Sequence, residues 1–309
     1  MLRERWGLDV NERQVGVLGA TSLVGACLLP VLTQAGWHVT AYSRCAVSQA
    51  GDGVAWRQLP GSELPSSPPS FQGGGGTTPY WVCVAPIWTL PEHFALLEAQ
   101  GARRVVVLSS TSRFTKDNSS NPEEQAVARR LAEAEARVQA WAENRGVEWV
   151  ILRPTLIYGL GRDKNITEIA RFIRRFGFFP LFGKANGLRQ PIHAEDVATA
   201  CLAALQAPAA ANHAYNLSGG ETLAYRDMVA RVFSALGRRP RLMHVPLSFF
   251  RVAIVLLRCF PRYREWSAAM AVRMNVDLLF DHTPATHDFA FKPRGFVLTT
   301  EDMPSEPGR

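Results

Sequence analysis

Short apolar runs recur along the chain as far as Leu217, separated by longer segments whose apolar positions repeat at helical spacing. Short apolar runs bounded by turn residues are typical of strands that are buried on both faces of a sheet. Six runs predict strands, at Gln14 to Leu18, Trp37 to Tyr42, Tyr80 to Ala85, Arg104 to Ser109, Glu148 to Leu152 and Ala214 to Leu217.

The segments between these strands predict four helices, at Ser22 to Ala35, Pro91 to Gln100, Pro122 to Asn144 and Ala194 to Gln206, and a fifth is predicted after the last strand, at Leu223 to Leu236. The longest helix has clear boundaries, because Asn121 is a favourable N-cap, Pro122 suits the first helical position and Gly146 stops the helix. Strands that alternate with helices predict an α/β fold, a doubly wound parallel sheet with helices on both faces.

The alternation loosens further along the chain, which predicts a second region. Arg57 to Pro79 is rich in proline, glycine and serine and predicts a long loop. We expect a domain at residues 12–218 that contains the sheet, and a smaller, mainly helical region at residues 219–309. Residues 161–190 are expected to contribute to the smaller region.

The composition is ordinary for a globular protein with one large or two modest domains. The chain has 309 residues, of which 47% are hydrophobic and 20% charged. Its five cysteines form no CxxC motif, which favours a reducing compartment, and no histidines and cysteines have zinc-ligand spacing, so no metal is expected. The charged N-terminal segment lacks the apolar core of a secretory signal, and we therefore expect a cytoplasmic protein.

The net charge of +7 raises the question of a nucleic-acid partner. The arginines are scattered rather than gathered in a basic run with aromatic residues, so we expect none. No uncharged apolar run is long enough for a transmembrane span. The nearest is an apolar helix predicted at Leu247 to Cys259, which is either a core helix, a wall of a pocket for a lipophilic substrate, or a peripheral contact with a membrane surface.

A turn of small residues joins the first predicted strand to the first predicted helix. Small residues let the backbone approach a diphosphate, and a helix N-terminus offers unpaired N–H groups and the positive end of a dipole. In this context the turn indicates a dinucleotide site, although Ser22 stands where a third glycine is usual. The alternative interpretation is a tight turn of an ordinary α/β domain. The expected contacts are Gly19, Ala20, Thr21, Ser22, Leu23, Val24 and Gly25.

The second predicted strand is followed by Ser43 and Arg44, where an NAD site usually has an acidic residue for the ribose hydroxyls. The guanidinium of Arg44 suits a 2′-phosphate instead. The sequence therefore favours NADP(H) over NAD(H), with Ser43 and Arg44 as contacts, unless Arg44 is an ordinary surface residue.

Several motifs in one order resemble a known family: VGVLGATSLVG, VVVLSSTS, VEWVILRPTLIYG, RQPIHAEDVATACLAAL and AYNLSGGETLAYRDM. They are similar to extended short-chain dehydrogenases/reductases of the NAD-dependent epimerase/dehydratase family. The resemblance implies a Rossmann-type sheet with a smaller C-terminal substrate region. It also implies cofactor contacts from Val84, Ala85 and Pro86 beside the adenine ribose and diphosphate, from Ser109 and Ser110 under the nicotinamide, and from Pro154, Thr155 and Leu156 at the nicotinamide end.

The chain departs from this family in its catalytic pair. The family uses Tyr-x-x-x-Lys on the long helix, in which the lysine lowers the pKa of the tyrosine that transfers the proton. None of the six tyrosines here is followed four residues later by lysine. Counting back from Glu135, which matches a glutamate of the family's helix, places Val127 and Leu131 at the two positions. The resemblance therefore identifies an atypical member.

Four other side chains are candidates for the chemistry or for substrate binding. Thr111 occupies the place of the family's catalytic Ser or Thr, or else caps its own strand end. Lys116 precedes the long helix, where a substrate would lie, and His193 has a side chain suited to acid–base work. Arg189 matches a segment from which the family often presents an arginine to an anionic substrate.

Two functions remain open at this point. The first is an atypical NADP(H)-dependent oxidoreductase or epimerase of a small molecule, in which water, the substrate or a non-standard residue transfers the proton. The second is a catalytically silent NADPH-binding accessory or sensor protein, by analogy with the NADPH-binding subunit of respiratory complex I. The protein is expected to be a monomer or a homodimer.

Overall fold

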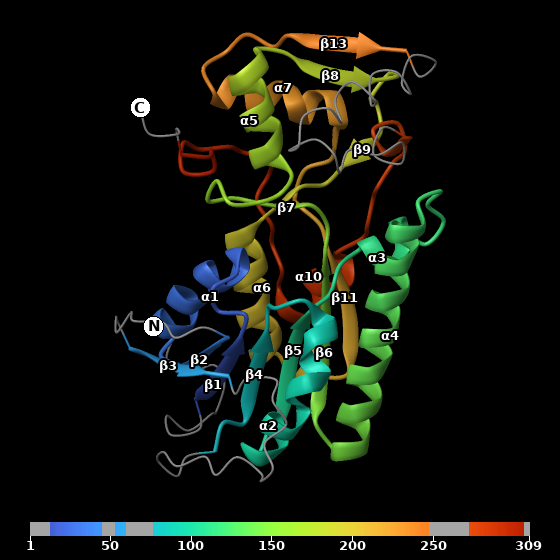
Figure 1. Cartoon of the computed structure of the whole chain (residues 1–309). Helices are drawn as coiled ribbons and strands as arrows, with labels where there is room; N and C mark the ends of the chain where they lie inside the picture. Colours follow the sequence, from blue (N-terminus) through green and yellow to red (C-terminus); the bar gives the residue numbers. More distant parts are fainter. Residues whose placement is uncertain (1–12, 45–52, 60–76, 247–271, 306–309) are drawn as a thin grey trace.

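The computed structural model describes residues 13–44, 53–59, 77–246 and 272–305. Its centre is a seven-stranded sheet in the order β11-β6-β5-β4-β1-β2-β3, in which every neighbouring pair is parallel (Figure 1). The strands are β1 (Gln14–Leu18), β2 (His38–Ser43), β3 (Val54–Gln58), β4 (Tyr80–Cys83), β5 (Arg104–Leu108), β6 (Glu148–Pro154) and β11 (His213–Leu217). The strand order reverses between β1 and β4, and ligands of open α/β sheets bind at such a reversal, outside the carboxyl ends of the strands.

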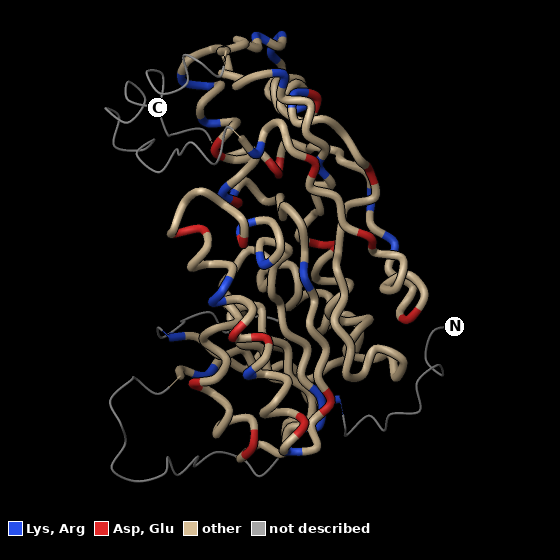
Figure 2. Tube along the Cα trace, turned by 90° about the vertical axis from the view of Figure 1, so that its right-hand side faces the viewer, with Lys and Arg blue, Asp and Glu red and all other residues tan. Residues whose placement is uncertain are grey.

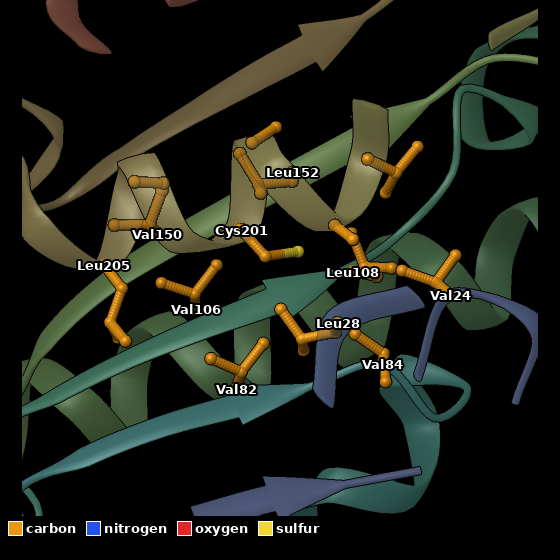
Figure 3. Packing of buried hydrophobic residues seen from close by; sticks show 14 of the residues in the cluster. Val24, Leu28, Val82, Val84, Val106, Leu108, Val150, Leu152, Cys201 and Leu205 are labelled. Atoms are coloured by element: carbon orange, nitrogen blue, oxygen red, sulfur yellow. The ribbon is translucent and has the colours of Figure 1, made fainter. Parts of the chain in front are cut away.

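Helices cover both faces of this sheet, as the sequence predicts. Alternate residues of β6 point to opposite faces: Val150 and Leu152 lie in one hydrophobic core, and Trp149 and Ile151 in the other. The first core is covered by α1 (Leu23–Gln34), α6 (Ala194–Gln206) and α10 (Thr283–Phe289), and the second by α2 (Phe94–Ala99) and α4 (Pro122–Arg145). Figure 3 shows side chains of α1 and α6 meeting those of β4, β5 and β6. The predicted Rossmann-type doubly wound sheet is confirmed.

The helix boundaries follow local capping. Asn121 accepts a hydrogen bond from the Glu123 N–H at 2.9 Å and opens α4, and Gly146 closes it in a left-handed conformation at φ +65°. Helix α6 has the predicted bounds. Helix α1 begins one residue later than predicted, because Ser22 is its N-cap.

A third hydrophobic core lies above the carboxyl edge of the sheet in Figure 1. Its main elements are α5 (Ile166–Phe176), β8 (Phe179–Phe182), α7 (Tyr225–Ala235) and β13 (Leu242–Val245). Four short strands connect it to the sheet: β7 (Ile157–Tyr158), β9 (Leu188–Arg189), β10 (Ile192–His193) and β12 (Leu223–Ala224). Met274, Phe296 and Met303 return from late in the chain to complete this core.

Three predictions of secondary structure were wrong. Strand β3 was not predicted, because its side chains are partly or fully exposed at the sheet edge and show no apolar run. The predicted helix Leu223 to Leu236 begins instead with β12, which pairs antiparallel with β9. A 3-10 helix, η2 (Ile87–His93), precedes α2 where one short helix from Pro91 was predicted. The predicted apolar helix Leu247 to Cys259 lies outside the described residues.

Charge is distributed along both parts of the described chain, with Lys and Arg interleaved with Asp and Glu (Figure 2). No described helix combines the length and hydrophobicity needed to cross a membrane. Cys27, Cys83 and Cys201 are free and buried, and burial raises the pKa of Cys27 to about 11 and that of Cys83 to about 12. These thiols therefore stay protonated and serve as small apolar core residues.

Candidate functional site at the carboxyl edge of the sheet

Gly19 closes the first turn against the segment that follows β4. Its φ is +81°, and a Cβ atom there would lie 2.4 Å from the backbone nitrogen of Ala85 and 2.8 Å from the carbonyl carbon of Val84. Only glycine allows this approach without moving the backbone. The first turn and Val84–Pro86, which the sequence predicts as cofactor contacts, therefore form adjoining walls where the strand order reverses.

Ser22 takes the place of the expected third glycine and acts as the N-cap of α1. Its Oγ accepts a hydrogen bond from the Gly25 N–H at 3.0 Å. Gly25 allows the helix to pack on the turn, since a Cβ atom there would lie 2.4 Å from the Ala20 carbonyl oxygen. The first turn of α1 contains no acidic residue. Helix geometry gives the N–H groups of Leu23 and Val24 no partner inside the helix, so this end is suited to an anion.

Arg44 follows β2 directly and is exposed, in the position where the sequence predicts a contact to a 2′-phosphate. Its carbonyl accepts a hydrogen bond from Gln58 Nε2 at 3.2 Å, which joins the ends of β2 and β3. Arg57 on β3 lies opposite Tyr42 on β2. Burial raises the pKa of Tyr42, and a hydrogen bond from Arg57 opposes this shift. Arg57 was not predicted as a site residue, because β3 itself was not predicted.

The ends of β5 and β6 carry several hydroxyl groups of the predicted nicotinamide side. Thr111 is buried, and both its N–H and its Oγ1 donate to the Pro154 carbonyl at 3.1 Å. Ser110 Oγ accepts from the Ser112 N–H at 3.1 Å, and Thr155 Oγ1 donates to the Gln190 carbonyl at 2.5 Å. The hydroxyl of Thr111 can still accept a hydrogen bond, but its proton is already donated to Pro154 in this geometry.

Glu135 on α4 is a fully buried carboxylate directly behind these strand ends. It accepts hydrogen bonds from Ser109 Oγ at 2.5 Å, from Arg153 Nη2 at 2.7 Å and from Arg113. Both guanidinium groups also lie over the ring of Phe114, with 5.3 and 5.5 Å to its centroid. One buried negative charge is thus matched by two positive charges, and Ser109 is fixed by this cluster at the end of β5.

Val127 and Leu131 occupy the positions to which the catalytic pair was assigned by counting back from Glu135. Leu131 is buried in the core between α4 and the sheet, and Val127 packs against the same core. Neither side chain carries a proton that could be transferred. The face of α4 that points to the sheet here is therefore apolar up to Glu135.

A second charged cluster surrounds the start of α4, where Lys116 was predicted to meet a substrate. Glu124 accepts a hydrogen bond from Ser119 Oγ at 2.6 Å and pairs with Arg273. Burial raises the pKa of Glu124, but the hydrogen bonds from Ser119 and Arg273 outweigh it and hold that pKa below its usual range. Burial lowers the pKa of Lys116, and the negative charge of Glu124 opposes this lowering only in part. The cluster brings Lys116 together with Arg273, a residue more than 150 positions away in the sequence.

Arg189 and His193 are engaged in contacts within the protein. Arg189 is buried and donates to the carbonyls of Leu188 at 2.7 Å and Val276 at 2.8 Å, and burial lowers its pKa to about 10, so it stays charged near neutrality. His193 caps α6: its Nδ1 accepts from the Glu195 N–H at 3.2 Å, and its Nε2 lies 3.0 Å from Asp302 Oδ1. Because Nδ1 is an acceptor, Nε2 carries the proton and donates to Asp302.

Among the described residues, no group of histidine, cysteine and carboxylate side chains is arranged to hold a metal ion. The polar groups at the carboxyl edge instead suit phosphate and hydroxyl ligands. They comprise the helix N-terminus, two arginines at the ends of β2 and β3, and the hydroxyls that follow β5 and β6.

Fold and site together define a Rossmann-type α/β protein with a nucleotide-type turn at the reversal of its strand order. Residues 93–218 match the family model of the NAD dependent epimerase/dehydratase family. The family resemblance predicted from the sequence is confirmed by this match.

Known proteins of more than one kind are similar to the chain. It is 29% identical over 173 residues to 2-alkyl-3-oxoalkanoate reductase of Stenotrophomonas maltophilia. This match covers 52% of this chain and 51% of the reductase. It is 26% identical over 118 residues to mitochondrial NADH dehydrogenase [ubiquinone] 1 alpha subcomplex subunit 9 of Arabidopsis thaliana. This match covers 38% of this chain and 29% of that subunit. The chain thus spans about half or less of the length of the curated relatives it matches.

Solved structures extend the likeness of the fold over nearly the whole chain. UDP-glucuronic acid 4-epimerase of Bacillus cereus, solved in complex with NAD, superposes with a TM-score of 0.66 at 11% identity and covers 94% of this chain and 95% of that one. At this identity the comparison supports the fold alone.

Proposed function

We propose that this protein binds NADP(H) at the carboxyl edge of its sheet and is an atypical NADP(H)-dependent oxidoreductase or epimerase of a small molecule. The observation that carries the proposal is the turn at Gly19, where the backbones of the turn and of Ala85 are too close for any side chain. Such an approach gives a diphosphate access to the N-terminus of α1. A structural neighbour with this fold was solved in complex with NAD, which motivates the choice of a dinucleotide as the proposed ligand.

The proposed preference for NADP(H) rests on charge at the ends of β2 and β3. Arg44 is exposed, Arg57 lies opposite Tyr42 near the end of the neighbouring strand, and no described residue at the end of β2 is acidic. A guanidinium attracts a 2′-phosphate, whereas a carboxylate is needed to accept hydrogen bonds from ribose hydroxyls.

In this proposal the bound cofactor supplies the hydride, and the chain binds and orients it. The turn and the N-terminus of α1 would hold the diphosphate, and Arg44 with Arg57 would hold the 2′-phosphate. Ser109, fixed by Glu135, and Thr111, fixed by Pro154, would border the nicotinamide. No proton donor is assigned on α4, because Val127 and Leu131 are apolar.

That same apolar face of α4 favours a second candidate, a catalytically silent NADPH-binding accessory or sensor protein. Such a protein needs the diphosphate turn and the arginines but no acid or base. The similarity to a subunit of mitochondrial NADH dehydrogenase supports this candidate. The two candidates share the cofactor and differ in turnover.

A titration of nicotinamide fluorescence tests the shared part. NADPH is expected to bind at least about tenfold more tightly than NADH. Arg44→Gln is expected to weaken the binding of NADPH by about tenfold, because one charge-assisted contact is lost. Arg145→Gln, at the far end of α4, is the matched control and leaves both affinities unchanged. Binding of neither nucleotide to the unmodified protein would overturn the proposal.

Incubation of the NADPH complex with a mixed carbonyl library separates the two candidates. Loss of nicotinamide fluorescence that depends on an added carbonyl compound indicates an enzyme. Fluorescence that stays constant for hours with every compound supports the silent protein.

A further inference from the structure

We propose that Arg162 is a diphosphate-binding residue of the cofactor site, brought to the first turn by a loop that Asp302 holds in place. This inference rests on the proposed function, since it names a further ligand contact of the same site. Neither residue belongs to the turn or to the strand ends that define that site.

Arg162 reaches the first turn from a distant part of the chain. Its Nη2 donates to the Thr21 carbonyl at 3.1 Å, across 141 residues of sequence. The side chain is exposed, and no ion pair within the described residues involves it. By contrast, Arg294, which follows α10, pairs with both Glu195 and Asp196 in the first turn of α6.

The guanidinium of Arg162 adds positive charge at the first turn. It lies beside the N-terminus of α1, which carries the positive end of the helix dipole, and the first turn of α1 has no acidic residue. A group with negative charge between Arg162 and the N–H groups of Leu23 and Val24 would interact favourably with both. The diphosphate of a dinucleotide has this charge, and it is the part of the cofactor that a glycine-rich turn receives.

The loop that carries Arg162 is held in one conformation by the segment at residues 299–304. Three consecutive residues before Arg162 have positive φ: Gly159 at 133°, Leu160 at 52° and Gly161 at 58°. A Cβ atom on Gly161 would lie 2.3 Å from the Met303 carbonyl oxygen, so the two segments are in direct backbone contact.

Asp302 is the residue that joins these parts. Its Oδ1 accepts from the Leu160 N–H at 3.3 Å and from His193 Nε2 at 3.0 Å, and its Oδ2 accepts from the Thr299 N–H at 2.8 Å. It is buried, and its hydrogen bonds within the described residues go to Leu160, His193 and Thr299 rather than to the first turn. Asp302 is therefore a positioning residue, which acts on the ligand only through Arg162.

Affinity measurements on the full chain test this assignment with three probes: NADPH, ADP-ribose and adenosine. Arg162→Gln is expected to weaken the binding of NADPH and of ADP-ribose by about tenfold or more, because one charge-assisted contact is lost. The affinity for adenosine should not change, because adenosine has no phosphate. Arg162→Lys keeps the charge and is expected to retain part of the affinity. Arg171→Gln, an exposed arginine of α5 paired with Glu168, is the control.

Asp302→Asn is expected to show the same selective pattern with a smaller loss, measured at a temperature where circular dichroism shows every variant folded. A general loss of folded protein would reduce the binding of all three probes alike, which separates positioning from stability.

Two outcomes overturn different statements. If the unmodified protein binds NADPH and ADP-ribose and Arg162→Gln binds them equally well, the assignment of Arg162 is wrong and the proposed function stands. If the unmodified protein binds neither, the proposed function fails, and the inference fails with it.

Discussion

Replacing Glu135 by glutamine tests whether the buried charge cluster stabilises the fold. The substitution keeps the volume of the side chain and an acceptor for Ser109, but it removes the charge that Arg113 and Arg153 share. Removing one partner of a buried ion pair costs about 3–5 kcal/mol. Since the two arginine side chains are 31% and 14% exposed, water can partly replace the carboxylate, and we expect the lower limit of about 3 kcal/mol.

The assay is thermal unfolding followed by circular dichroism. At about 2 °C per kcal/mol for a large chain, Glu135→Gln is expected to lower the melting temperature by about 6 °C. Glu168→Gln is the matched control, because Glu168 pairs with Arg171 on the surface of α5, where an ion pair contributes about 0.5 kcal/mol. Adding Arg113→Gln to Glu135→Gln should recover part of the loss, since one unpaired cation is then removed. Equal melting temperatures for Glu135→Gln and Glu168→Gln would refute the reasoning.

Three further predictions concern the turn and the loop that meets it. Gly19→Ala places a methyl group against Ala85 and is expected to raise the Kd for NADPH by more than about tenfold in the fluorescence titration; an unchanged Kd would show that the turn does not approach a ligand. Ser22→Ala removes the helix cap and is expected to lower the free energy of unfolding by about 1 kcal/mol, measured by urea unfolding. Ser22→Gly should lower it by only a few tenths of a kcal/mol, and equal losses for the two variants would argue against the cap. Burial raises the pKa of Asp302, but hydrogen bonds from His193 and Thr299 outweigh it and bring the pKa to about 2. Because this value lies below the unfolded value of about 3.9, the carboxylate contributes about 2.6 kcal/mol to the free energy of unfolding. This contribution is complete above about pH 4 and is lost as the pH falls through 2. Asp302→Asn should remove that part of the pH dependence in unfolding titrations, and an unchanged slope would contradict the assignment.

The sequence was sufficient for the features that depend on neighbouring residues. The N-cap at Asn121, the stop at Gly146 and the turn from Gly19 to Gly25 are each defined by residues a few positions apart, and the structure has all three. The same holds for the buried strands, whose apolar runs arise because both faces of the sheet are covered.

The features that were missed depend on contacts between distant segments. Arg162 meets Thr21 across 141 residues, and Asp302 meets His193 across 109, so no local pattern marks either residue. The helix predicted from Leu223 begins as a strand because Leu188 and Arg189 pair with its first two residues. Ordinary helical spacing contains no information about such a partner.

Residues 285–303 contribute to two cores, and this has a consequence for the order of folding. Phe289 and Phe291 fill the core beneath α6, while Phe296 and Met303 fill the core that contains α5 and α7. During synthesis, neither core can close before this segment has left the ribosome, so the two parts of the protein are expected to become protease-resistant together rather than one after the other. A shortened chain that ends before Phe289 should therefore expose apolar surface in both parts at once.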